Sequence, residues 1–495
     1  MQGSILLFPI MTLSNDCAVF IRFCRSLFLT SILTLILATI FLRTCSAAEL
    51  PPSVMEATSR GGIAPHAIGI HVQEVGSNTP LVAMNGSTAF NPASTMKLVT
   101  TYAALEMLGP AYTWKTRVFA LGPQIGDVLQ GDLALQGGGD PKLTLERLWM
   151  LLRELRARGI RDIRGNLVLD RNAFEPQPFN AAIFDDDPLK PYNAGPDALL
   201  LDHRTLRLRF LPDEANGRMI VATDPPMASY TIQPPRLMNG PCGDWRDGLL
   251  PVFDEAGIRF DGGFAASCGE RTMILHAGQI NPNRYAGAVF RRMWEDLGGT
   301  FQGQAIDGVV PAGARLITVV ESPSLPEIVR DINKFSNNVM SRQLLLTLAA
   351  EITALQGNPE RGAVVVKTWL AAKGIAAPEL VIENGAGLSR VERISADTLG
   401  RMLVAAFRVP IMPEFIASMP LVGFDGTMRN RLKERSVVGN AHIKTGSLNE
   451  VRAIAGYVLA ASGKRYAVVC LINHPNAKYG RDVQDALLQW VYEAG

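Results

Sequence analysis

The chain has 495 residues, of which 47% are hydrophobic and 19% are charged, and its formal net charge is +2. This composition excludes a disordered chain, and the length predicts about three domains of ordinary size. Residues 1–48 hold three of the 48 basic and one of the 46 acidic residues, so the rest of the chain is neutral, with 45 of each. Without a basic excess, neither nucleic acid nor an anionic membrane surface is indicated as a partner.

Residues 1–48 have the organisation of an export signal. Two arginines precede an apolar stretch at 27–42, and Ser46-Ala47-Ala48 supplies the small residues that a signal peptidase accepts. An uncleaved membrane anchor is the alternative, because the apolar stretch is barely long enough to span a bilayer. The region before the arginines is long, so Met11 is a second candidate start. We predict a signal peptide at 1–48 and an exported mature chain.

Cysteines and histidines give a weaker signal. Three of the six cysteines lie within residues 1–48. In an oxidising compartment Cys242 and Cys268 could close a loop of about 25 residues. Cys470 lies in the run AVVCLI, which is typical of a buried strand, and is interpreted as a small core residue. The six histidines are scattered without the paired spacing of metal ligands, so the sequence predicts no metal site.

The first expected elements are a hairpin and a helix. Residues 66–74 and 81–84 are typical of two strands joined by a Gly-Ser-Asn turn. The run LVTTYAALEML then has helical spacing and stops at Gly109-Pro110. Residues 115–320 are rich in short strand-like runs, such as NLVLD, RLRF and MIVAT, that Gly, Pro and Asn separate. One helix, at 145–158, is expected to interrupt them.

From residue 325 the sequence predicts long helices again. The runs LPEIVRDINKF, VMSRQLLLTLAAEI and RGAVVVKTWLAAKG are helical, and a further helix is expected at 395–407. The runs HIKTGS, AIAGYVLA and YAVVCLI follow as three strands with short connections, and a helix at 482–492 closes the chain.

A hairpin at the start and a strand meander at the end indicate one α/β domain that is split by an insertion. We predict that residues 49–115 and 320–495 form this domain, and that its first and last strands share an antiparallel sheet flanked by helices. Residues 116–319 would form a β-rich inserted region. A smaller domain is expected to be nested within it at about 200–275, where Pro234-Pro235 and two cysteines lie.

Three short motifs carry the chemistry. Ser94-Thr95-Met96-Lys97 is the only Ser-x-x-Lys in the sequence, and it stands where a Pro-containing loop turns into a helix. Ser336-Asn337-Asn338 lies between two expected helices, and Lys444-Thr445-Gly446, the only Lys-Thr-Gly, lies on an expected strand. Each motif alone is weak. Together, in this order and these contexts, they are the signature of penicillin-recognising serine acyltransferases.

The motifs divide the catalytic roles among four side chains. Residues three apart on a helix share a face, so Lys97 can reach the Ser94 hydroxyl and take its proton while Ser94 attacks a carbonyl. Ser336 can pass that proton to the leaving amine. Lys444 adds positive charge that keeps Lys97 neutral and attracts a substrate carboxylate.

The remaining motif residues are predicted to bind substrate. The Asn338 side chain can bond the amide next to the scissile bond, and the Thr445 and Ser447 hydroxyls can hold a terminal carboxylate. Backbone N–H groups of Ser94 and Ser447 would form the oxyanion hole, worth about 3 kcal/mol per donor. Gly446 lets the strand edge approach the substrate closely.

The chain resembles the low-molecular-mass class C penicillin-binding proteins, the D-alanyl-D-alanine carboxypeptidase/endopeptidase family. Ser94 and Ser336 lie 242 positions apart, a distance that this family fills with two domains inserted in its penicillin-binding domain. The runs GGGDP, NLVLD, ENGAGLSR and KTGSL are further similar stretches. The resemblance implies a penicillin-binding (serine β-lactamase-like) α/β domain with two inserted domains. It also implies that Asp170 and Arg390 help to bind the peptide.

The resemblance implies hydrolysis of D-Ala–D-Ala ends of peptidoglycan stem peptides and of D-amino-acid cross-links, with β-lactams acylating Ser94. It implies no cofactor and a periplasmic location, allows a loose membrane association, and leaves the oligomeric state open. Two positions depart from relatives: Asn337, where Asp is frequent, and Asn449, where some relatives have Gln. The second departure leaves the finer substrate preference open.

Two other functions stay open at this point. A β-lactamase or a D-amino-acid amidase or esterase would need fast deacylation, which the motifs do not exclude. A catalytically slow protein that binds peptidoglycan could keep the same pocket, although a binding module has little need of the nucleophile Ser94.

Overall fold

The computed structural model describes residues 50–495 except 229, 255 and 256. The predicted signal peptide at 1–48 therefore lies outside the described residues. Among the helices of the described part, none is both long and apolar enough to cross a membrane.

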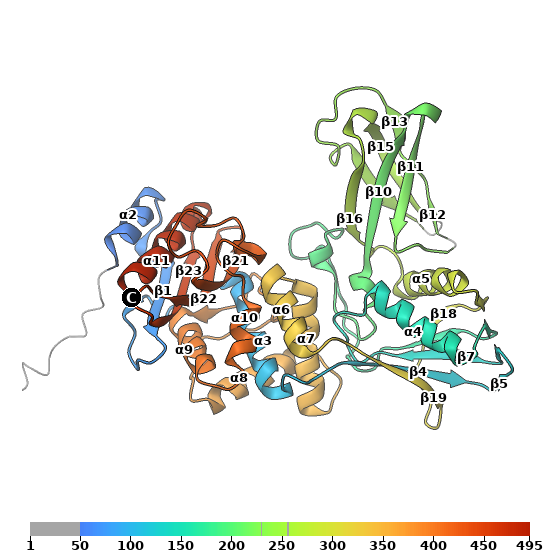
Figure 1. Ribbon diagram of the computed structural model, residues 1–495, viewed down its shortest axis with the longest axis horizontal. Coiled ribbons are helices and arrows are strands. Elements are labelled where there is room, and N and C mark those ends of the chain that lie inside the picture. Colours follow the sequence, from blue (N-terminus) through green and yellow to red (C-terminus); the bar gives the residue numbers. More distant parts are fainter. Residues whose placement is uncertain (1–49, 229, 255–256) are drawn as a thin grey trace, which may run out of the picture. The chain divides into compact units, whose positions relative to one another are not determined.

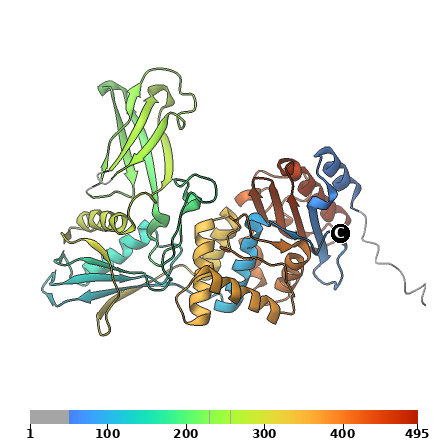
Figure 2. The ribbon, with the colours of Figure 1, turned by 180° about the vertical axis from the view of Figure 1, so that it is seen from behind.

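A five-stranded antiparallel sheet joins the two ends of the described chain. Its strands follow the order β2-β1-β23-β22-β21. Their bounds are β1 Ile68–Glu74, β2 Val82–Met84, β21 Ala441–Leu448, β22 Val451–Leu459 and β23 Arg465–Asn473. Strand β1 pairs with β23 over its whole length, from Ile68 opposite Ile472 to Glu74 opposite Tyr466. The prediction that the first and last strands share an antiparallel sheet is confirmed, and Figure 2 shows the blue strand beside the red ones.

Helices cover both faces of this sheet. The side chains on both faces of its strands are therefore buried. On β23, Val468, Cys470 and Ile472 face one core, and Val469 and Leu471 face the other. Cys470 is a buried free cysteine, as predicted. Helices α2 Pro52–Arg60 and α11 Gly480–Ala494 pack on the first face. The other face carries α3 Met96–Leu108, α6 Leu325–Phe335, α7 Asn338–Thr353, α8 Pro359–Ala372, α9 Ala396–Phe407 and α10 Met412–Ser418.

The intervening residues form separate sheets with a core of their own (Figure 1). The larger sheet has the order β18-β9-β7-β4-β19. Its strands are β4 Lys115–Leu121, β7 Asp132–Gln136, β9 Leu167–Asp170, β18 Ala305–Asp307 and β19 Arg315–Glu321. Helix α4 Leu145–Ala157 confirms the predicted helix within a residue.

The expectation of one helix in this region is wrong, because α5 Pro282–Asp296 is a second. The Asn281 side chain caps it, Pro282 occupies its first turn, and one face carries the buried Tyr285, Val289 and Trp294. Cap, first-turn proline and apolar spacing are all sequence signals of a helix, so this element could have been predicted.

Between α4 and α5 in the chain, a second group of strands accompanies the disulfide. Strand β10 Thr205–Asp213 pairs with β11 Arg218–Asp224 and with β16 Arg271–His276. Cys242 and Cys268 are bonded, which confirms the pairing that the sequence allowed. The structure describes these strands, and the domain boundaries drawn from sequence stay a prediction.

Candidate functional site

Ser94 lies in a 3₁₀ turn, Ala93–Thr95, that leads directly into α3. The loop before it is tightly held, because Asn91 and Asn473 of β23 exchange two hydrogen bonds, of 2.7 and 3.0 Å. The Asn91 side chain also accepts from the Ala93 N–H at 2.9 Å. Ala93 is fully buried with φ of 44°, a conformation that costs a non-glycine residue energy. This loop thus fixes the position of the Ser94 hydroxyl.

Lys97 is fully buried one helical turn later. Its Nζ lies 3.0 Å from Ser94 Oγ, 2.6 Å from Asn338 Oδ1 and in contact with the carbonyl of Ala386. Burial lowers the pKa of Lys97 well below its ordinary value, and the charge of Lys444 lowers it further. A lowered pKa makes this amine give up its proton more readily, and in its neutral form it can act as a base toward Ser94.

Ser336 and Lys444 form a second pair. Ser336 ends α6 with a left-handed φ of 58°, which turns its side chain out between α6 and α7. Lys444 of β21 is fully buried, and its Nζ donates to Ser336 Oγ at 2.9 Å and to the Thr445 carbonyl at 2.7 Å. Burial lowers the pKa of Lys444 to about 7.

Strand β21 is an edge strand of the sheet and lies directly against the Ser94 loop. A Cβ atom on Gly446 would stand 2.8 Å from the Pro92 carbonyl and 2.9 Å from the Ser94 nitrogen. Only glycine allows this approach without displacing the loop. The Thr445 hydroxyl contacts the Thr427 hydroxyl at 2.7 Å, and Ser447 is exposed. Thr427 was not predicted, because no motif marks it.

The loop 383–392 supports the pair of Ser94 and Lys97 from the other side. Its Ala386 carbonyl contacts Lys97, and a Cβ atom on Gly387 would overlap the Ala93 carbonyl. Within the loop, Glu392 accepts hydrogen bonds from three backbone N–H groups. The sequence had marked the glycines of this loop, but nothing in it pointed to the Ala386 carbonyl or to Glu392 as neighbours of Lys97.

Among the described residues, the two carried over from the resemblance form no hydrogen bond with the side chains of Ser94, Lys97, Ser336 or Lys444. Asp170 is 1% exposed, and its carboxylate accepts 3.0 Å hydrogen bonds from Gln136 Nε2 and from the backbone N–H groups of Asn172 and Val310. Its oxygens are thus engaged within the inserted region. Arg390 is exposed, with its guanidinium 4.6 Å from the ring centroid of Phe184.

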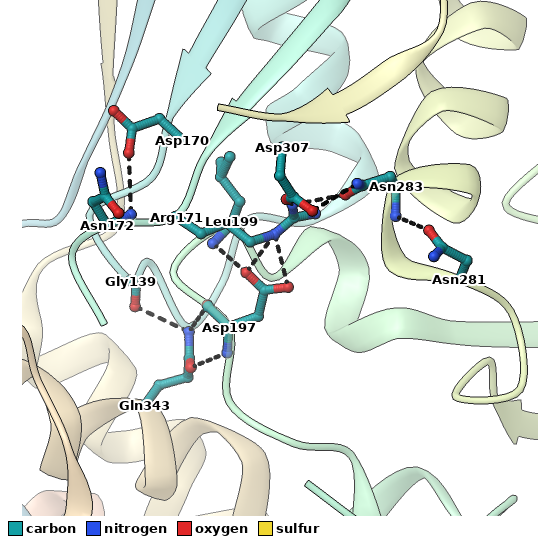
Figure 3. A network of polar contacts seen from close by, with 10 residues as sticks. All are labelled: Gly139, Asp170, Arg171, Asn172, Asp197, Leu199, Asn281, Asn283, Asp307 and Gln343. Carbon is teal, nitrogen blue, oxygen red and sulfur yellow. Dashed lines mark hydrogen bonds and ion pairs between the residues drawn. The ribbon is translucent and has the colours of Figure 1, made fainter. Parts of the chain in front are cut away.

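A polar network joins the inserted region to α7, the helix that begins with Asn338 (Figure 3). Gln343 accepts from the Asp197 N–H at 2.9 Å and donates to the carbonyl groups of Asp197 at 2.8 Å and Gly139 at 3.2 Å. The Asp197 carboxylate is paired with Arg171 at 3.0 Å, and Arg171 also contacts Asp307. This network therefore attaches α7 to the inserted region at Gln343, in the second turn of the helix.

Comparison with known proteins agrees with this geometry. A family model described as the D-Ala-D-Ala carboxypeptidase 3 (S13) family matches residues 52–494. The D-alanyl-D-alanine carboxypeptidase of Actinomadura sp. (strain R39) is 30% identical over 416 residues, which are 80% of this chain and 76% of that protein. The D-alanyl-D-alanine carboxypeptidase DacB of Haemophilus influenzae is 26% identical over 411 residues, 82% of this chain and 85% of that protein.

Solved structures show the same fold. The crystal structure of penicillin-binding protein 4 from Haemophilus influenzae superposes with a TM-score of 0.76 at 24% identity, covering 89% of this chain and 99% of that one. Its complex with a β-lactam superposes with a TM-score of 0.72. The predicted α/β penicillin-binding fold is confirmed. The chain belongs to the D-Ala-D-Ala carboxypeptidase 3 (S13) family.

Proposed function

We propose that this chain is a serine DD-peptidase that forms an acyl-enzyme on Ser94 and hydrolyses D-Ala–D-Ala ends and D-amino-acid cross-links of peptidoglycan. The contact between Ser94 Oγ and the buried Lys97 amine, in a chain of this family, carries the proposal. The complex of the structural relative with a β-lactam supports acylation by β-lactams.

Acylation begins when the Ser94 hydroxyl gives its proton to the Lys97 lone pair and its oxygen bonds to the scissile carbonyl carbon. A neutral Lys97 has two N–H bonds left, and these match its two other contacts, Asn338 Oδ1 and the Ala386 carbonyl. The oxyanion is received by the backbone N–H groups of Ser94 and Ser447. The geometry supports this because β21 lies against the Ser94 nitrogen at Gly446.

Breakdown of the tetrahedral adduct needs a proton on the leaving amine. Ser336 donates it and is resupplied from Lys97, so the proton that left Ser94 ends on the D-alanine released. Lys444, bonded to Ser336, stabilises the hydroxyl in this role. Water then attacks the ester and gives a proton to Lys97. As the bond from the carbonyl carbon to Ser94 Oγ breaks, Lys97 returns this proton to Ser94 Oγ, and the shortened peptide is released.

Substrate binding uses the remaining donors. Asn338 offers its Nδ2 to a peptide carbonyl, because its Oδ1 is engaged by Lys97. The Thr445 and Ser447 hydroxyls, with Lys444 behind them, receive the terminal carboxylate. Arg390 is proposed to bind the peptide, since the carbonyl of its neighbour Ser389 accepts from Asn91 in the Ser94 loop at 2.8 Å. A peptide contact by Asp170 would require one of its three hydrogen bonds to exchange. We place the enzyme in the periplasm, where this substrate lies.

Mass spectrometry tests the proposal. The purified protein is incubated with a β-lactam and, separately, with pentapeptide and cross-linked muropeptides. We expect one acyl adduct on the peptide that contains Ser94, loss of terminal D-alanine, and conversion of dimers to monomers. Ser94→Ala should abolish all three, and Ser87→Ala, an exposed serine nearby, should abolish none. An adduct elsewhere, or unchanged muropeptides, would contradict the proposal.

A further inference from the structure

Glu392 is a buried carboxylate with one oxygen unused. Its side chain is fully buried, and Oε1 accepts from the backbone N–H groups of Glu383, Asn384 and Gly385 at 3.1, 2.9 and 2.8 Å. Oε2 is also buried and has no hydrogen-bond partner among the described residues. Buried polar atoms are nearly always satisfied, and an exception calls for an explanation.

The three N–H groups fix the segment that contacts the catalytic base. One residue beyond them, the Ala386 carbonyl contacts Lys97 Nζ. The carbonyl of Gly385 in turn accepts from Thr100 Oγ1 of α3 at 2.7 Å and from Ser341 Oγ of α7 at 2.8 Å. Glu392, α3 and α7 therefore all form hydrogen bonds with residues 383–385, and together they fix the position of the Ala386 carbonyl that follows.

The charges around Lys97 come from three elements. Lys444 of β21 and Arg342 of α7 are cationic and lower the pKa of Lys97, whereas Glu392 is the anion that raises it. Burial lowers the pKa of Arg342, and the charges of Glu392 and Glu383, in the same loop, oppose that lowering. Burial raises the pKa of Glu392, and the three backbone N–H groups and Lys97 oppose that rise. An anion held by backbone donors close to a buried amine has a clear use when that amine takes up a proton.

We propose that Glu392 is a positioning residue for acylation, which holds the Ala386 carbonyl on Lys97 and supplies the fixed counter-charge for the ammonium that forms when Lys97 takes the Ser94 proton. The inference rests on the proposed function. No bond to Glu392 forms or breaks: the proton moves from Ser94 Oγ to Lys97 Nζ, and the carboxylate stabilises the charge that develops there. Such preorganised charge acts strongly in a site that excludes water.

The pH profile of acylation distinguishes this role from a structural one. Acylation of Ser94 by a β-lactam is first established for the wild-type protein, so that failure of the proposed function shows separately. Glu392→Gln keeps an oxygen for the three N–H groups and removes the charge. We expect the plateau rate to fall about tenfold or more. The acid limb should move to lower pH by about one unit, because Lys97 loses a favourable anion and gives up its proton more easily.

Two further variants complete the test. Glu392→Asp keeps the charge, so its acid limb should stay at the wild-type pH while its rate falls several-fold. Glu360→Gln, an exposed carboxylate on α8, should change neither quantity. A folded Glu392→Gln protein whose acid limb does not move would overturn the proposal, whatever its rate. If Glu392→Gln does not fold, Glu392→Asp decides, and acylation at the wild-type rate would overturn it.

Discussion

At the scale of single residues, two fully buried lysines set the chemistry. Removing an ammonium from water costs several kcal/mol, and loss of the proton is the usual way to avoid that cost. Burial accordingly lowers the pKa of both Lys97 and Lys444. The burial that makes Lys97 a base also lowers the free energy of unfolding, because an ammonium loses its hydration when the chain folds.

Lys444 allows this exchange to be measured. Its pKa is about 7 in the folded protein and near 10.5 when exposed. Between these values the unfolded chain binds the extra proton, so the stability of the folded state rises with pH across this window. Lys444→Met should therefore raise the unfolding temperature by a few degrees near pH 7, and the gain should shrink as the pH approaches about 10.5.

Thermal unfolding of wild type and Lys444→Met at several pH values checks this prediction. Acylation of Ser94 should be slower in the variant at every pH, because Ser336 loses its donor. Lys367→Met, at an exposed lysine of α8, should show neither effect. A stability gain that is independent of pH would mean that packing, and not the charge of Lys444, accounts for the difference in stability between the two proteins.

At the scale of elements, three boundaries place the motifs together: the start of α3, the break between α6 and α7, and the edge strand β21. All three were predicted from sequence within a residue or two, because caps, glycine stops and apolar spacing are local signals. The helix α5 was missed although its signals were present. The contacts of Lys97 with Ala386 and of Thr445 with Thr427 were beyond sequence reasoning, since they depend on how distant loops pack.

The close packing of β21 against the Ser94 loop depends on the absence of a side chain at Gly446. Gly446→Ala would place a methyl group 2.8 Å from the Pro92 carbonyl and 2.9 Å from the Ser94 nitrogen. Because both atoms are backbone, strand and loop must separate, and a shift of about 1 Å can cost 10²-fold in rate. We expect the acylation rate to fall at least tenfold, with the unfolding temperature nearly unchanged.

Stopped-flow acylation and thermal unfolding of the two glycine variants test this expectation. Gly76→Ala is the control, because its nearest neighbour would be a flexible glutamate oxygen at 3.5 Å. Wild-type acylation in Gly446→Ala would show that the loop yields without cost and that close approach of β21 is not needed.

At the scale of the whole molecule, the inserted region contacts the catalytic residues through a helix. Gln343 of α7 binds Asp197 and Gly139 of the insert, and Asn338 opens the same helix. The sequence predicted an insertion from the hairpin at its start and the strand meander at its end, but it could not predict this attachment. It also left Asp170 a peptide-binding candidate, whereas the structure engages its carboxylate within the insert.

The disulfide offers a way to change the stability of the inserted region without changing the catalytic residues. Cys242 and Cys268 close a loop that lies between β11 and β16 in the chain. The described hydrogen-bond partners of Ser94, Lys97 and Lys444 all lie outside residues 205–276. Replacing both cysteines by serine should lower the unfolding free energy by about 3 kcal/mol.

Acylation of Ser94 by a β-lactam should nevertheless stay within about twofold of wild type in this double variant. The described hydrogen bonds from the insert to Arg342 and Gln343 of α7 come from Gly139, Ala194 and Asp197, which lie outside the disulfide loop. Reduction of the wild-type disulfide should reproduce both results, which excludes an effect of the serines. Denaturant unfolding and acylation rates measured on the same samples decide. If acylation fell in parallel with stability, the nested strands would have to act on the catalytic residues through α7, and the insert would be part of the catalytic unit.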